Sequence, residues 1–317
     1  LKVILFISFS LFFSCGIITQ VNPDNIDIIR GEYGTPHIFG KTDEEVAFGL
    51  AWAHAEDDFK TIQETFLPSK SLMGHYQGKE GLKLDYISQL LKCEELVERE
   101  MLNFSPKFLG VVNGYVEGLN AYAKKFPNKV LVKKSFPMSN KEYLIGFNFV
   151  IHFFSDISKV LKDLYSNNIP LIQDSVLNNI GSNGFAFKKT KTVENKTFIN
   201  INTHQPLEGP FSWYEAHLHS EEGWNMLGGL FPGGAFPFIG TNENLAWTHT
   251  TNYPDLIDVY QMQIHPKKNN YYLYDGKWTK FDISKAKLRI KLKSGIVIPL
   301  RKKILWSKYG PVVKNDS

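Results

Sequence analysis

The stretch NNIGSNGFAF, residues 178–187, marks the point where the character of the chain changes. Upstream, residues 80–170 show mainly the three-to-four spacing of helices, interrupted by polar loops. Downstream, apolar and polar residues alternate with the period of a strand. The strand-like segments are TFININ (197–202), WYEAHLHS (213–220), NLAWTHTT (244–251) and IDVYQMQI (257–264). A helical half followed by a β half predicts an α+β fold with mainly antiparallel sheets rather than a parallel βαβ array.

The composition is that of a globular protein that does not bind nucleic acid. The chain has 317 residues, of which 43% are hydrophobic and 14% aromatic, which is enough for a large core. Its 36 basic and 32 acidic residues give a net charge of +4, and the lysines are scattered rather than clustered. A nucleic-acid-binding surface needs a concentrated basic patch, so we expect no such partner.

The first residues have the pattern of an export signal. Lys2 precedes an apolar run from Val3 to Phe13, which is followed by Ser14 and Cys15. A spanning helix needs about 20 apolar residues, whereas the apolar region of a secretory signal needs about 7–15. We therefore expect residues 1–15 to direct export to the periplasm. Cys15 also resembles the lipid-attachment cysteine of bacterial lipoproteins, so anchoring to the outer membrane is the alternative.

Cysteine usage predicts no disulfide framework. If Cys15 is removed or lipidated, Cys93 has no intrachain partner. We expect Cys93 to be a buried thiol that behaves as a small apolar side chain.

Turn and capping signals define the elements around these segments. DIIRGEYGTPHIFG (27–40) reads as two extended pieces around a turn at 34–36. A helix follows, with Thr42 and Glu45 forming a capping box. Its predicted inward face consists of Val46, Leu50, Ala53, Phe59, Ile62 and Phe66. Hairpin turns are expected at Asp275-Gly276 and Ser294-Gly295.

Common catalytic and metal-binding motifs are absent from the sequence. There is no Walker loop, dinucleotide fingerprint, HExxH, GxSxG elbow or cysteine pair at zinc spacing. His217 and His219 would share one face of a strand. Two histidines without a third ligand are more often ordinary surface residues, so we do not assign a metal to them.

Several segments together carry a family resemblance. They are IIRGEYGTPHIFG (28–40), EVAFGLAWAHAEDDF (45–59), GSNGFAF (181–187), NTHQP (202–206) with YEAHL (214–218), and GTNENLAWTHTTNYPDLIDVYQMQ (240–263). With these in order, the chain resembles the penicillin acylase (penicillin amidase) family of N-terminal-nucleophile hydrolases, especially its acyl-homoserine-lactone and aculeacin acylase branch. The resemblance implies a four-layer αββα sandwich with antiparallel sheets.

The same resemblance implies that the precursor cuts itself between Gly181 and Ser182, which makes Ser182 the first residue of a new chain. An N-terminal serine supplies the hydroxyl nucleophile and, in its own α-amine, the base. The ordinary pKa of an α-amine is about 7.7–8.0, so a useful fraction is unprotonated near neutral pH. No histidine–aspartate pair is then needed to activate the hydroxyl. A glycine at 181 leaves room for the tight turn that the cleavage requires.

Further site residues follow from the resemblance alone. His204 matches the histidine that positions the serine and assists self-cleavage, and Thr251 matches the residue whose backbone N–H forms half of the oxyanion hole. The family's other donor, an asparagine side chain, and an accompanying arginine would lie beyond Ser317, so we expect the sequence to be C-terminally truncated. Phe154 matches an aromatic residue of the acyl pocket.

A structural calcium ion is also implied by the resemblance. Asp255, Ile257 and Asp258 match the stretch that holds it through two carboxylates and a backbone carbonyl, which are the hard oxygen ligands that calcium prefers. The family takes another carboxylate from the first chain, and Val160 stands at the matching position, with Asp163 nearby.

These inferences divide the chain and define its expected function. We expect an export signal at 1–15, a mostly helical α-subunit-like part at 16–165, a linker or spacer at 166–181, and the start of a β subunit at 182–317. The expected activity is hydrolysis of N-acylated small molecules, either acyl-homoserine lactones, as in quorum quenching, or penicillins and other antibiotics, without an organic cofactor. The alternative is a surface-binding lipoprotein with the same fold and no catalysis.

Overall fold

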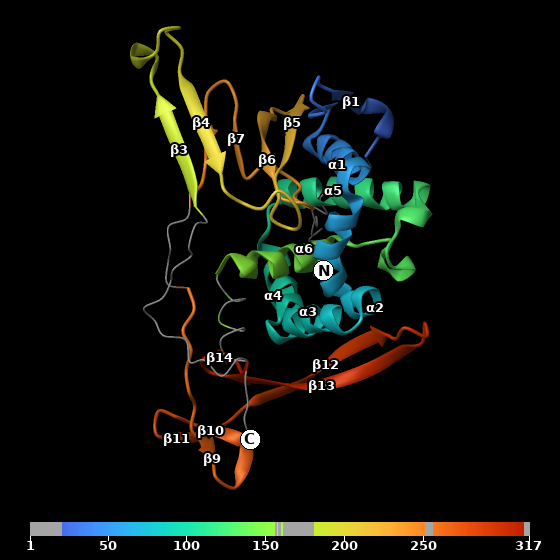
Figure 1. Cartoon of the computed structure of the whole chain (residues 1–317), viewed down its shortest axis with the longest axis vertical. Coiled ribbons are helices and arrows are strands. Elements are labelled where there is room, and N and C mark those ends of the chain that lie inside the picture. The colour runs from blue at the N-terminus through green and yellow to red at the C-terminus, as the bar shows by residue number, and fades with distance from the viewer. Residues whose placement is uncertain (1–20, 156, 158–159, 161–180, 251–255, 314–317) are drawn as a thin grey trace, which may run out of the picture.

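The computed structural model describes residues 21–155, 157, 160, 181–250 and 256–313 (Figure 1). Its helices are α1 Asp43–Phe66, α2 Met73–Gln77, α3 Lys79–Leu90, α4 Cys93–Glu100, α5 Pro106–Lys125 and α6 Asn140–Ile151, with 3-10 turns that include η2 Leu67–Lys70 and η6 His152–Ser155. Its strands are β1 Asp27–Arg30, β2 Pro36–Gly40, β3 Ser182–Phe187, β4 Phe198–Thr203, β5 Tyr214–Ser220, β6 Asn225–Leu230, β7 Ile239–Thr241, β8 Ala246–Trp247, β9 Ile264–His265, β10 Lys268–Tyr274, β11 Lys277–Lys280, β12 Asp282–Lys291, β13 Val297–Ser307 and β14 Gly310–Pro311.

Helix α1 begins at the predicted capping box. The Thr42 hydroxyl accepts a hydrogen bond from the Glu45 N–H at 3.1 Å, and the Glu45 carboxylate accepts one from the Thr42 N–H at 3.2 Å. The helix breaks at Asp58, where φ is −147° and ψ is 57°. The Asp58 carboxylate accepts from the Thr61 N–H at 3.1 Å and so caps the second part. All the apolar residues predicted to face inward are buried.

Glycines allow helix α5 to lie unusually close to α1. A Cβ built on Gly114 would lie 2.0 Å from the Glu44 carbonyl oxygen, and one on Gly118 would lie 2.5 Å from that of Phe48. Beside these contacts Tyr115 is fully buried in the main core. Only glycine fits such backbone-to-backbone contact, so α1 and α5 form one rigid layer.

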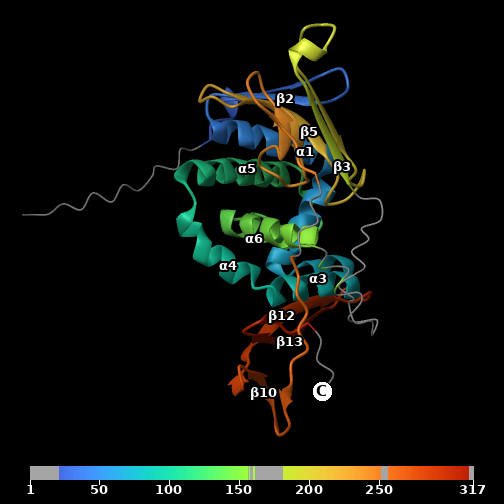
Figure 2. The same cartoon turned by 90° about the vertical axis from the view of Figure 1, so that its left-hand side faces the viewer.

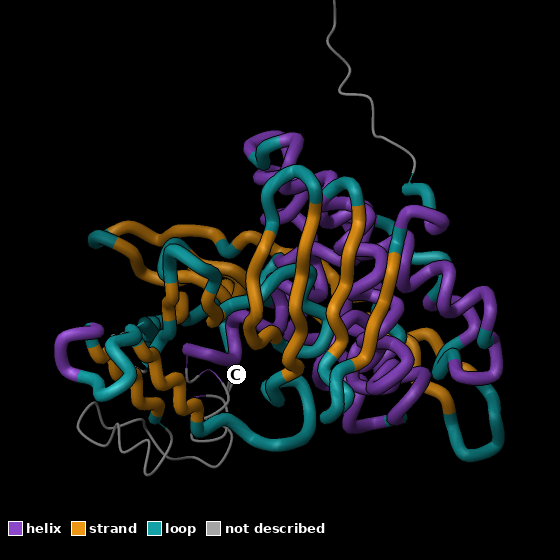
Figure 3. Tube along the Cα trace, turned by 90° about the horizontal axis from the view of Figure 1, so that it is seen from above, coloured by secondary structure: helices purple, strands orange, loops and turns teal. Residues whose placement is uncertain are grey.

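That layer covers one face of a six-stranded sheet, and Figure 3 shows the helices behind the strands. The strand order is β1-β2-β5-β6-β7-β8. The sheet combines strands that precede and follow the helices in the sequence, because β2 pairs with β5. This pair is parallel, and the other pairs are antiparallel. The predicted α+β class with mainly antiparallel sheets is therefore confirmed.

The other strands of the described residues form three smaller sheets, with the strand orders β3-β4, β11-β10-β9 and β12-β13-β14. Figure 2 shows the six-stranded sheet on one side of the helices and the β12–β13 hairpin on the other. Ala286, Leu288 and Ile304 of that hairpin form a second core with Leu90 of α3. The described residues form one large sheet and these small ones, so the four-layer sandwich stays a prediction.

The predicted hairpin turns are confirmed, and two strand predictions need correction. Asp275 and Gly276 both have positive φ between β10 and β11, and Gly295 has φ +87° between β12 and β13. The strand predicted over 257–264 is wrong except at Ile264, and that over 244–251 shortens to Ala246–Trp247. The alternation of apolar and polar residues indicates which side chains would face the core if the segment were a strand. A strand also needs a neighbouring strand to which its backbone can hydrogen-bond. Most residues of these two segments have no neighbouring strand to pair with in the described part of the chain.

Cys93 is fully buried, as predicted, and burial raises the pKa of its thiol to about 12. None of the helices in the described residues combines the length and apolarity needed to cross a bilayer. The predicted export signal at 1–15 and most of the predicted linker at 166–181 lie outside the described residues.

Candidate active site

The hairpin β3–β4 brings together residues that are far apart in the sequence. The two strands are antiparallel, and Ser182 pairs with Thr203. Continuing this register by one step places Gly181 opposite His204, and a Cβ built on Gly181 would lie 3.7 Å from His204 Nδ1. Three of the residues predicted from sequence to act in cleavage therefore lie at one end of the hairpin.

The hydroxyl of Ser182 lies against the peptide bond that precedes it. Its Oγ donates a hydrogen bond of 2.7 Å to the carbonyl oxygen of Gly181. The Ser182 side chain is half-buried, while His204 is exposed. A hydroxyl beside a carbonyl group, with an imidazole near that group, is a set of residues from which attack on the carbonyl can begin.

The end of β8 reaches the same strand. Because side chains alternate, Ser182 and Gly184 share a face of β3. A Cβ on Gly184 would lie 2.5 Å from the methyl group of Thr248, so the absence of a side chain there admits the segment after β8. The Thr248 hydroxyl is buried and has no hydrogen-bond partner within the described residues. Thr251, the predicted oxyanion donor, lies outside them.

The remaining predicted residues are only partly described. Asp255 and the side chain of Phe154 lie outside the described residues, although the backbone of Phe154 belongs to η6. Ile257 is half-buried. Asp258 is exposed, and its carboxylate accepts a long hydrogen bond of 3.4 Å from the Tyr260 hydroxyl. Within the described residues no three His, Cys, Asp or Glu side chains are grouped so that they could hold a metal ion.

An aromatic cluster next to His204 was missed in the sequence. The residue after it, Gln205, accepts a hydrogen bond of 3.0 Å from the indole N–H of Trp213. Trp213 packs on Phe231 with ring centroids 4.3 Å apart, and Phe231 packs on Phe238 at 5.2 Å. A further contact of 5.9 Å joins Phe238 to Phe147 of α6. These aromatic residues are scattered along the chain, so only their contacts identify them as an apolar wall.

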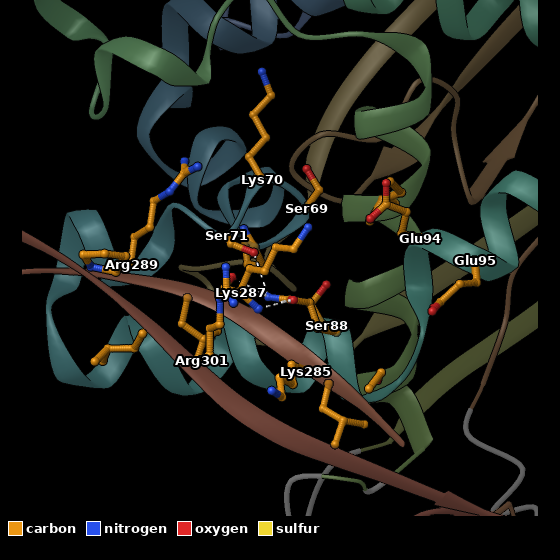
Figure 4. Close-up of a pocket in the computed structure, with 18 residues that line it drawn as sticks. Ser69, Lys70, Ser71, Ser88, Glu94, Glu95, Lys285, Lys287, Arg289 and Arg301 are labelled. Atoms are coloured by element: carbon orange, nitrogen blue, oxygen red, sulfur yellow. Dashed lines mark hydrogen bonds between the residues drawn. The ribbon is translucent and has the colours of Figure 1, made fainter. Parts of the chain in front are cut away.

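A cavity of about 800 Å³ lies elsewhere, between η2, α3, α4 and the β12–β13 hairpin (Figure 4). It contains serines and lysines, but they do not form a nucleophile–base pair. Lys70 Nζ donates to the carbonyl oxygens of Ser135 and Pro137 and pairs with Glu142 at 3.2 Å, and Figure 4 shows it pointing away from Ser71. The chemistry at Ser182 therefore identifies the better candidate, although its surroundings are less enclosed.

Comparison with known proteins identifies a family and several relatives. Residues 25–317 match the family model described as penicillin amidase. The chain is 23% identical over 317 residues to acyl-homoserine lactone acylase PvdQ of Pseudomonas fluorescens (strain Pf0-1), covering 91% of this chain and 41% of that protein. It is 22% identical over 345 residues to acyl-homoserine lactone acylase QuiP of Pseudomonas aeruginosa, covering 92% and 40%.

The chain thus spans about two fifths of the length of the relatives it matches. Among solved structures, a thermostable penicillin G acylase from Alcaligenes faecalis aligns with 45% of this chain and 81% of its own, at 18% identity and a TM-score of 0.36. A similarity at that TM-score carries no argument about the site.

Proposed function

The chain belongs to the penicillin amidase family, and we propose that it carries the nucleophile of an amide hydrolase that removes the acyl group from N-acylated small molecules. The observation that supports this most directly is the 2.7 Å hydrogen bond from the Ser182 hydroxyl to the Gly181 carbonyl oxygen, with His204 beside Gly181. The relatives are named acyl-homoserine lactone acylases. Because this chain spans only part of their length, acylase activity is proposed here for the whole protein.

The first proposed step is self-cleavage. Ser182 Oγ attacks the carbonyl carbon of Gly181, the Gly181–Ser182 C–N bond breaks, and the hydroxyl proton passes to the departing nitrogen. Water then hydrolyses the resulting ester, which leaves a carboxylate on Gly181 and a free α-amine on Ser182. His204 is close enough to Gly181 to orient the reacting groups during this rearrangement.

The same serine then acts on the substrate. Its hydroxyl attacks the amide carbonyl while its free α-amine, with an ordinary pKa of about 7.7–8.0, accepts the proton. In the proposal the Thr251 N–H donates to the oxyanion, a contribution of about 3 kcal/mol to transition-state stability in comparable enzymes. The acyl group passes to Ser182, the amine product leaves, and water releases the acid.

The proposed acyl site is the aromatic wall. Trp213 and Phe238 are half-buried and offer apolar ring surface to an acyl chain, and the buried Phe231 packs between them. The Gln205 contact connects this wall to His204. We propose acyl-homoserine lactones as the first substrates to test, with penicillin side-chain amides and lipopeptide acyl tails next. An apolar wall discriminates by only about 1–3 kcal/mol per methylene, so we expect neighbouring chain lengths to be accepted.

A structural calcium ion is part of the proposal. Asp258 is exposed, and among the described residues its carboxylate accepts one long hydrogen bond, from Tyr260, so its oxygens are available to a hard cation. Together with Asp255 and the carbonyl group of Ile257 it would supply oxygen ligands. When bound, the ion would neutralise the two carboxylates and hold the chain that follows Thr251 in place.

We also propose export to the periplasm or outer membrane, supported by the signal-like residues 1–15. Cell fractionation would compare the wild type with Cys15→Ala. Retention of both in the cytoplasm would contradict export, and equal release of both from membranes would contradict a lipid anchor.

The decisive experiment is intact mass and N-terminal sequencing of the protein, purified beside Ser182→Ala and a control, Ser212→Ala. Ser212 also donates to a glycine carbonyl, that of Gly209 at 2.8 Å, but in an ordinary turn. We expect the wild type and the control to yield a new chain that starts Ser-Asn-Gly-Phe, and Ser182→Ala to stay uncut. A single uncut chain in all three would refute the mechanism and favour a surface-binding lipoprotein.

A further inference from the structure

A pair of histidines lies on the face of the six-stranded sheet that points away from α1. His37 of β2 and His217 of β5 are direct partners in the parallel pair. Their neighbours Ile38 and Leu218 are fully buried in the core against α1, so the alternating histidines face the other side. The two Nδ1 atoms are 3.2 Å apart, and the rings are inclined by 64°.

The orientation of the His217 ring is set by a hydrogen bond at its other nitrogen atom. His217 Nε2 lies 3.1 Å from the side-chain oxygen of Asn225, which can only accept, so Nε2 carries the proton and Nδ1 presents a lone pair. His37 Nε2 lies beside Gly31, where a Cβ would come within 3.3 Å of it. The two Nδ1 atoms face each other, and both can bind one cation when His37 carries its proton on Nε2.

We propose that His37 and His217 chelate a divalent cation of the zinc and copper class through these Nδ1 atoms. Zinc–nitrogen bonds are about 2.0–2.1 Å, so two nitrogens on one tetrahedral ion are about 3.3 Å apart. The observed separation of 3.2 Å needs almost no adjustment. The Asn225 contact is the kind of outer hydrogen bond that orients a metal-binding histidine.

The ligand atoms determine which cation is expected and how its coordination is completed. Imidazole nitrogen suits zinc, copper and nickel, and calcium and magnesium prefer oxygen. Because no larger cluster of His, Cys, Asp and Glu is grouped for a metal in the described part of the chain, water completes the coordination. Glu215, two residues before His217 on the same face, adds negative charge nearby. This site does not depend on the activity proposed for Ser182.

Titration calorimetry with Zn²⁺ on untagged protein tests the proposal. We expect one bound ion per chain and no heat from Mg²⁺. Losing a residue that only orients a ligand costs about 10–100-fold in affinity, so Asn225→Leu should fall in that range, and His37→Gln and His217→Gln should lose at least about 100-fold. His219→Gln is the matched control, because it removes a histidine from the same strand face and should bind as the wild type does.

A spectroscopic measurement on the wild type alone covers the case in which a variant fails to fold. Bound Cu²⁺ should show the electron paramagnetic resonance hyperfine pattern of two imidazole nitrogens. The proposal would be overturned by any of three results: the wild type binds neither Zn²⁺ nor Cu²⁺, bound Cu²⁺ shows a one-nitrogen pattern, or folded His37→Gln binds zinc as tightly as the wild type. In that case the 3.2 Å contact is a hydrogen bond between the two rings.

Discussion

The buried histidine of α1 should make the stability of the fold depend on pH. His54 is 1% exposed and stacks on Tyr214 with ring centroids 3.9 Å apart and planes inclined by 7°. Burial lowers the pKa of His54 from 6.5 to about 3, against the smaller opposite effect of the Asp58 and Asp57 carboxylates. The side chain is therefore neutral in the folded protein at any pH above about 3, whereas in the unfolded chain it takes up a proton below about 6.5.

The sign and size of the effect follow from this difference. Between pH 6.5 and 3 the unfolded chain binds a proton that the folded chain excludes, so the free energy of unfolding falls as the pH falls. At pH 4.5, two pH units below 6.5, the loss attributable to His54 is about 3 kcal/mol, at about 1.36 kcal/mol per unit. That is a large part of the 5–15 kcal/mol typical of a domain.

Urea unfolding at pH 7 and pH 4.5, compared between the wild type and His54→Phe, isolates this contribution. Phenylalanine can keep the stacking on Tyr214 and cannot titrate. It also removes a buried Nδ1 for which the described part of the chain offers no hydrogen-bond partner. At pH 7 we expect the variant to be at least as stable as the wild type. At pH 4.5 it should gain a further advantage of about 3 kcal/mol. An equal loss of stability in both proteins between the two pH values would refute the reasoning.

Two further predictions concern packing and metal binding. Gly114→Ala should destabilise the fold by at least about 1–3 kcal/mol, measured by thermal unfolding, because its Cβ would lie 2.0 Å from the Glu44 carbonyl oxygen. Gly209→Ala, where no described atom lies within 4 Å but φ is +86°, shows for comparison the cost of backbone strain without a clash. An unchanged unfolding temperature of Gly114→Ala would contradict close packing at Gly114. If calcium binds at Asp258, a calcium chelator should lower the unfolding temperature of the wild type and leave Asp258→Asn almost unchanged; equal effects on the two would count against the calcium site.

Local signals in the sequence were sufficient for caps and tight turns. The capping box of Thr42 and Glu45 and the turn at Asp275-Gly276 were predicted correctly, because both depend on interactions between residues a few positions apart. The strand predicted over 257–264 failed because pairing depends on a neighbour that a local pattern does not name. The aromatic wall of Trp213, Phe231 and Phe238 was missed for the same reason.

The sequence by itself determined the division into helical and strand-rich halves, the family, and the identity of Ser182 and His204 as candidates, because these depend on residue type and order. Only the tertiary structure decided that β2 pairs with β5 and so joins strands that precede and follow the helices in one sheet. It also placed the Ser182 hydroxyl on the Gly181 carbonyl oxygen and His37 against His217. Contacts between residues 180 positions apart arise from the packing of the whole chain, which no local pattern encodes.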